Sequence, residues 1–151
     1  MSPRSLYARL AVAEVVSWAL LLLGMVLKYV TQTTELGVKV FGMVHGVVFI
    51  AFVLVTILVA VNQRWSVREA VLGLASAVPP FLTVWFERRM ERRGRLDGGW
   101  RLGHDEARPE NPLERVLHTL MARPAVAVAV GLAAVAGLTG LALVVGPPVP
   151  S

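Results

Sequence analysis

The residues best suited to chemistry in this 151-residue chain lie inside long apolar runs. Glu14 stands within LAVAEVVSWALLLLGMVL, and His45 is the single ionisable residue between Val40 and Val61. A carboxylate at the centre of a membrane-spanning helix costs about 2.5 to 3.5 kcal/mol, so it normally faces a bundle interior or water. Glu14 and His45 are therefore candidates for structural hydrogen bonding or for proton exchange.

Small and polar residues share a helical stripe with Glu14. The first stripe contains Glu14, Ser17, Leu21, Gly24 and Lys28, and the third apolar run contains Glu69, Gly73, Ser76, Pro80, Thr83 and Glu87. This alternating spacing of three and four keeps side chains on one helix face. If the two segments run parallel, an offset of 59 aligns Ser17 with Ser76 and predicts an ion pair between Lys28 and Glu87.

The second apolar run carries a close-packing signal beside His45. Gly42 and Gly46 form G-x-x-x-G, and small residues of this kind let helices approach closely. We therefore expect the faces that carry Gly24, Gly42, Gly46 and Gly73 to meet around the intramembrane polar residues.

The sequence carries little that indicates catalysis. It has no cysteine, no G-x-S-x-G, no H-E-x-x-H and no glycine-rich phosphate loop. His104-Asp105-Glu106 lies in a glycine-rich hydrophilic stretch that is typical of a solvated loop. With no second histidine in the apolar runs, we expect neither a metal site nor a cofactor, and no enzyme activity.

Composition places these residues in a membrane protein. Hydrophobic residues make up 56 % of the chain and charged residues 17 %, with a mean hydropathy of +0.64, whereas soluble domains average about 25 % charged. A spanning helix needs roughly 20 apolar residues, and four such runs occur, at about 6–28, 40–61, 67–86 and 124–146. The sequence predicts an all-α, polytopic fold with four spans.

Residues 1–90 are expected to form a three-helix membrane core, because short links join the first three runs. Residues 91–123 form an Arg-rich connection, into which the third helix should continue with Glu91 and Arg95 paired four residues apart. Asn111-Pro112-Leu113-Glu114 is a good helix start and predicts a short interfacial helix over 112–122. Residues 124–151 should hold a fourth transmembrane helix and a proline-rich tail.

The net charge of +5 comes from basic residues that stand beside apolar runs. Acidic residues partly offset the arginines of the connection, so lipid is a better partner than nucleic acid. We expect contact with anionic lipid head groups from Arg88, Arg89, Arg92, Arg93 and Arg95. Four spans would place four Lys and Arg on one side and eleven on the other, which predicts external termini and a cytoplasmic connection.

Five short motifs in fixed order resemble a known family. They are Glu14-Val15-Val16-Ser17, Met25-Val26-Leu27-Lys28-Tyr29, Gly42-Met43-Val44-His45-Gly46, Trp65-Ser66 and Pro80-Phe81-Leu82-Thr83. Over about residues 5–90 the chain resembles domain-of-unknown-function family 3817, which groups small bacterial integral membrane proteins. It departs from the family pattern at Val15, Val26 and Leu82, where the family has Gly, Pro and Gly. The resemblance implies a three-helix bacterial membrane unit with no established activity.

Two functional hypotheses follow. The first is a non-enzymatic accessory or interaction subunit of a larger assembly in the bacterial inner membrane, which contacts lipid and other membrane subunits. The alternative is a small proton-coupled or solute transporter that acts as a homo-oligomer through Glu14 and His45.

Overall fold

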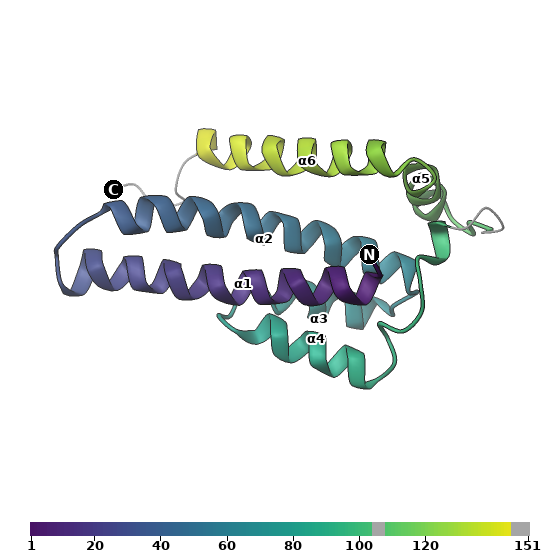
Figure 1. Cartoon of the computed structure of the whole chain (residues 1–151), viewed down its shortest axis with the longest axis horizontal. Coiled ribbons are helices and arrows are strands. Elements are labelled where there is room, and N and C mark those ends of the chain that lie inside the picture. Colours follow the sequence, from purple (N-terminus) through teal and green to yellow (C-terminus); the bar gives the residue numbers. More distant parts are fainter. Residues whose placement is uncertain (104–107, 146–151) are drawn as a thin grey trace.

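The computed structural model describes residues 1–103 and 108–145, and these residues are helical without a β-strand. The elements are α1 (Pro3–Met25), a π-helical extension η1 (Val26–Val30), α2 (Leu36–Asn62), α3 (Val67–Ala75), α4 (Leu82–Arg92), a 3-10 turn η2 (Arg101–Gly103), α5 (Pro112–Met121) and α6 (Pro124–Val145). The predicted all-α fold is confirmed (Figure 1).

An antiparallel pair, α1 and α2, forms the spine of the molecule (Figure 1). The continuous helix from Pro3 to Val30 has 28 residues and α2 has 27, and both are apolar enough to cross a membrane. At 1.5 Å per residue each is about 40 Å long, which exceeds the roughly 30 Å hydrocarbon core of a bilayer. Their outer faces expose large apolar side chains such as Val12, Val16 and Met43, as expected for surfaces that face lipid.

The third apolar run is not a single span, and the prediction for residues 67–86 is wrong. The run divides into α3 and α4, which form a hairpin. Pro79 and Pro80 lie between the two helices, where each lacks a backbone N–H and restricts the residue before it. Phe81 then adopts a left-handed conformation with φ of 70°. The tandem prolines therefore mark a chain reversal.

The entering arm α3 packs against α2, and the returning arm α4 packs against α1 and runs toward its N-terminal end. The indole nitrogen of Trp18 donates to the Ala77 carbonyl at 3.3 Å, so the tip lies about halfway along α1. The predicted offset of 59 holds at this contact. On the return arm Thr83 Oγ1 donates to the Ala11 carbonyl at 3.2 Å. Later residues of the hairpin thus contact earlier residues of α1, as in an antiparallel pair.

The predicted ion pair between Lys28 and Glu87 is wrong for the same reason. Lys28 lies at the far end of α1, where its Nζ is 3.6 Å from Glu35 of the loop. Glu87 is buried on the returning α4, whose final turn reaches the start of α1 through the Arg4–Glu91 ion pair.

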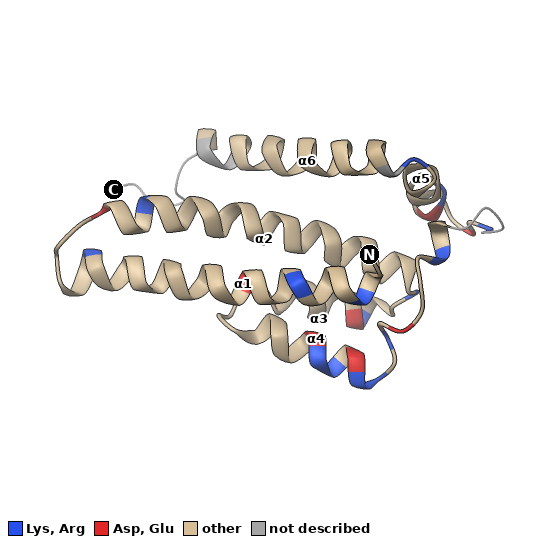
Figure 2. Ribbon diagram, in the orientation of Figure 1, with Lys and Arg blue, Asp and Glu red and all other residues tan. Residues whose placement is uncertain are grey.

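Charged residues gather at the two ends of the helix bundle, with few between them (Figure 2). The N-terminus and the Arg-rich connection occupy the same end, where Trp100 Nε1 donates to the Met1 carbonyl at 2.7 Å. The prediction that the N-terminus and the long connection lie on opposite sides is therefore wrong. Lys28, Glu35 and Lys39 lie at the other end.

An aromatic cluster fixes the open end of the hairpin to the spine. The Tyr7 ring packs against Phe52 and Trp65, with centroids 5.4 and 5.7 Å away, and Trp65 meets Phe86 at 5.9 Å. Trp65 Nε1 also donates to the Arg95 carbonyl at 2.9 Å, just beyond α4. The cluster therefore joins α1, α2 and α4 to the link before α3.

The interfacial helix predicted over 112–122 matches α5 closely. Asn111 Oδ1 caps it by accepting the Glu114 backbone N–H at 2.8 Å, and Pro112 is its first residue. The chain then bends by 114° into α6, which lies along α2 (Figure 1). The described residues thus contain two helices long and apolar enough to span a membrane, or three candidates if α5 and α6 count as one bent span, and the four expected spans are not confirmed.

The close contact between α1 and α2 involves Gly24, as expected, but its partner is Gly37 and not Gly42 or Gly46. A Cβ on Gly24 would stand 2.7 Å from the Gly37 carbonyl carbon, so α1 and α2 meet backbone to backbone. A Cβ on Gly42 would meet only a Leu21 methyl at 3.8 Å, and one on Gly46 would meet nothing within 4 Å among the described residues. The G-x-x-x-G of α2 is therefore not a tight contact in this structure.

Gly24→Ala should lower the unfolding free energy by about 1 to 3 kcal/mol, because the new methyl overlaps backbone that cannot move aside. Thermal unfolding in mild detergent measures the effect, with Gly46→Ala as the matched control that should change little. Equal effects of the two substitutions would contradict the contact between Gly24 and Gly37.

Candidate functional site: a buried glutamate, serine and histidine

Three polar side chains from α1 and α2 meet between apolar helices. Ser17 Oγ lies within donating distance of two oxygens of Glu14, the backbone carbonyl at 2.9 Å and Oε2 at 3.1 Å, and it is 3.0 Å from His45 Nδ1. His45 Nδ1 is itself 3.5 Å from Glu14 Oε2. One turn of α1 supplies the carboxyl and the hydroxyl, and α2 supplies the imidazole, so the expected meeting of these faces is observed for Glu14, Ser17 and His45.

Two members of the cluster are buried, and the third, His45, keeps 12 % of its side chain exposed. Glu14 has no exposed surface, and Ser17 is 2 % exposed. The Trp18 ring covers His45, with centroids 4.4 Å apart, and Phe49 lies on the imidazole at 6.2 Å. Glu14 Oε1 is buried without a hydrogen-bond partner among the residues that the structure describes, so the carboxyl uses only one of its two oxygens.

This arrangement can hold or pass a proton. A hydroxyl between a carboxyl and an imidazole can donate to one and accept from the other, which links two titratable groups through one hydrogen-bonded atom. The geometry requires only that the Ser17 hydroxyl rotate. The cluster can therefore serve as a structural polar contact or as a short proton relay.

The same three residue types occur in hydrolytic triads, but their connections here differ. In such a triad the carboxylate orients the histidine through the ring nitrogen that does not contact the serine. Here the carboxylate and the hydroxyl both approach Nδ1 of His45, and the hydroxyl is covered. The arrangement therefore lacks the geometry of nucleophilic catalysis.

Apart from Lys28, the other intramembrane candidates belong to the hairpin and do not join this cluster. Ser76 Oγ donates to the Gly73 carbonyl of its own helix at 2.6 Å. Gly73 instead provides a contact surface, because a Cβ there would lie 3.0 Å from Thr56 and 3.1 Å from Phe86. Thr83 bonds across to α1, and Pro80 forms part of the turn.

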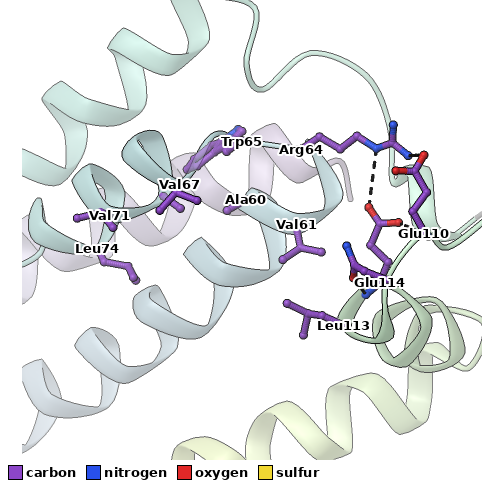
Figure 3. Close-up of a pocket in the computed structure, with 12 residues that line it drawn as sticks. Ala60, Val61, Arg64, Trp65, Val67, Val71, Leu74, Glu110, Leu113 and Glu114 are labelled. Atoms are coloured by element: carbon purple, nitrogen blue, oxygen red, sulfur yellow. Dashed lines mark hydrogen bonds and ion pairs between the residues drawn. The ribbon is translucent and has the colours of Figure 1, made fainter.

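A second polar cluster holds α5 against the end of α2. Glu114 Oε1 accepts from Arg101 at 2.5 Å and lies 3.8 Å from Arg64, while Oε2 accepts the Glu110 backbone N–H at 2.9 Å. The Glu110 N–H and then Arg101 hold the pKa of Glu114 below its ordinary value. Figure 3 shows Arg64 reaching both glutamates at the mouth of an apolar groove of about 410 Å³.

The expected pairing within the Arg-rich segment is wrong. α4 ends at Arg92, before the residues that would complete a Glu91–Arg95 pair. Glu91 instead binds Arg4, and Arg95 binds Glu69 at 2.7 Å. The other arginines assigned to lipid, Arg88, Arg89, Arg92 and Arg93, are exposed.

Several functional positions lay outside the sequence prediction. Trp18 is one of them, because its ring and N–H join the polar cluster to the hairpin tip. Its place beside Ser17 could have suggested this role. Gly37 and Glu114 had no comparable signal, because a lone glycine and a glutamate at a helix start have many common structural roles.

No metal-binding group of three or more His, Asp or Glu side chains occurs within residues 1–103 and 108–145. The motif His104-Asp105-Glu106 lies outside the described residues.

Comparison with known proteins adds a family and one relative. The sequence profile of the family described as Domain of unknown function (DUF3817) matches residues 4–92, which run from the start of α1 to the end of α4. A protein of Streptomyces coelicolor named "Putative membrane protein" is 49 % identical over 88 residues. That match covers 58 % of this chain and 10 % of the relative. No solved structure matches.

Ser17→Ala should lower the unfolding free energy by about 1 to 3 kcal/mol, because it leaves Glu14 and His45 buried without their shared hydroxyl. Ser76→Ala is the matched control, because the Ser76 hydroxyl bonds only to its own helix. Thermal unfolding in detergent compares the two variants. A smaller loss for Ser17→Ala than for Ser76→Ala would show that the hydroxyl does not hold the cluster together.

Proposed function

The chain belongs to the DUF3817 family, and from that premise we propose that it is a non-enzymatic accessory subunit of a larger assembly in the bacterial inner membrane. Membrane character follows from its apolar helices and its similarity to a membrane protein. We propose three further properties of this membrane protein: its role as a subunit, its lack of enzyme activity and its insertion by more than one membrane span.

The observation that carries this proposal is the size of the Streptomyces relative. The matching unit makes up 10 % of that protein, so in the relative the unit is joined to a chain many times its length. A unit that is fused to other segments in one protein is well suited to bind separate subunits in another. We infer that α1 to α4 act as the shared module.

The burial of Glu14 and Ser17 in the intramembrane cluster also supports this proposal. Glu14 and Ser17 are almost completely covered and take part in helix contacts, which suits permanent packing. Partners would include other membrane subunits, a second copy of the chain and anionic lipid head groups.

Purification from its own host in mild detergent should yield this protein with a membrane partner in constant stoichiometry. Deleting the gene of that partner should lower the amount of this protein, because unassembled membrane subunits are degraded. Quantitative mass spectrometry measures both results, with an unrelated small membrane protein as the control. Recovery of this chain alone as a homo-oligomer would overturn the proposal.

A proton-coupled or solute transporter is the second candidate, and the relay between Glu14, Ser17 and His45 is the observation that favours it. In that role Glu14 would change its protonation during transport, so Glu14→Gln would abolish coupling while preserving the fold. An accessory subunit would keep its function in the same variant, and this difference separates the two proposals.

The corrected chain path also changes the orientation that we propose. With the hairpin returning to its starting end, Lys28 and Lys39 lie at one end of the bundle and the thirteen arginines at or near the other. Because Lys and Arg are enriched in cytoplasmic loops, we place the N-terminus and the Arg-rich connection in the cytoplasm. The link between α1 and α2 is then outside.

Cysteine labelling can test this orientation, because the chain has no cysteine of its own. In intact cells, a membrane-impermeant maleimide should label Thr33→Cys but not Gly99→Cys. After the cells are opened, both variants should react. Labelling of Gly99→Cys in intact cells, with Thr33→Cys protected, would reverse the orientation.

A further inference from the structure

The two arms of the hairpin enclose a groove with a polar part and an apolar part. The polar part has a volume of about 250 Å³, and among its lining residues are Arg68, Arg89 and Arg93. The apolar part has a volume of about 360 Å³ and lies against Leu72, Pro79 and Trp85. Leu72, Phe86 and Arg89 line both parts, so the two adjoin each other.

Positive charge in the polar part is available for a ligand. Arg68, Arg89 and Arg93 are exposed and make no ion pair with a carboxylate among the described residues. Glu69 also lines this part, but its Oε2 already binds Arg95 at 2.7 Å and the Ser66 N–H at 2.8 Å. Three arginines without a carboxylate partner among the described residues therefore line the polar part, and the one glutamate there is already paired with Arg95.

Arg89 stands where the two parts join. Its guanidinium carbon lies 5.4 Å from the centroid of the Trp85 ring, which is a cation–π contact. Trp85 also lines the apolar part. An aromatic ring beside an arginine is typical of the depth at which a lipid head group meets its acyl chains.

The groove also has the direction that a lipid requires. Its polar part lies toward the charged end of the hairpin, near Ser66 and Arg93. Its apolar part extends to Pro79 near the tip, which lies about halfway along α1. Charge at the membrane surface and apolar surface at depth match the two ends of a phospholipid.

The geometry points to a binding site for one anionic glycerophospholipid between α3 and α4. Its phosphate lies among Arg68, Arg89 and Arg93, and an acyl chain lies against Leu72 and Trp85 toward Pro79. Arginine suits this ligand because its planar fork binds phosphate oxygens in pairs. The sequence predicted lipid contact from five arginines of this segment. Three of them, Arg88, Arg92 and Arg95, do not line the groove and are not part of the proposed site.

Native mass spectrometry of the detergent-solubilised full chain can test the site with added dioleoyl phosphatidylglycerol or phosphatidylcholine. We expect one phosphatidylglycerol to be retained in preference to phosphatidylcholine. Arg89→Gln and Arg68→Gln should each reduce retention roughly fivefold, since each basic residue near a lipid surface contributes about that factor. Arg92→Gln is the matched control on the same helix and should retain the lipid.

A second variant tests the apolar part. Ala75→Phe adds a ring beside the groove without changing charge, and it should weaken retention of the lipid while circular dichroism shows the helices intact. Equal loss in Arg92→Gln and Arg89→Gln would indicate diffuse attraction and overturn the site. Unchanged retention in Ala75→Phe, equal retention of phosphatidylcholine, or full displacement of the lipid by inorganic phosphate would also overturn it.

Discussion

The hydrogen bond from the Trp18 indole to the Ala77 carbonyl holds the arrangement of the hairpin. A chain that turns inside apolar surroundings leaves backbone groups without helical partners, and these must be satisfied by neighbouring segments. Trp18 does this for one carbonyl at the tip while its ring covers His45. The hairpin turn and the buried polar cluster are therefore in contact with the same side chain.

The element pattern could be predicted where local chemistry decides it. The Asn111-Pro112 start of α5 needs only a cap and a proline, and α5 begins at Pro112 as expected. The apolar runs of α1 and α2 likewise fix two long helices. The meeting of Glu14, Ser17 and His45 was predictable because polar groups in an apolar bundle must find each other.

The division of the third run was harder to predict, because hydropathy measures composition and does not measure direction. Residues 67–86 have the length and apolar content of a span, and a proline within a spanning helix is often only a kink. Two successive prolines followed by Phe81 in a left-handed conformation give a reversal instead. Because of this reversal, α4 ends near the start of α1. The predicted Lys28–Glu87 pair therefore does not form, and the predicted count of Lys and Arg on each side of the membrane no longer applies.

The returning hairpin has a consequence for how the protein enters a membrane. If the N-terminus and the Arg-rich connection are both cytoplasmic, as we propose, the insertion machinery need not carry the guanidinium groups of the connection through hydrocarbon. Within α1 to α4, the polar stretch that must be translocated is the link after η1, flanked by Lys28 and Lys39. In that orientation the hairpin enters and leaves the membrane on the same side, so α3 and α4 insert without the translocation of a polar segment of their own.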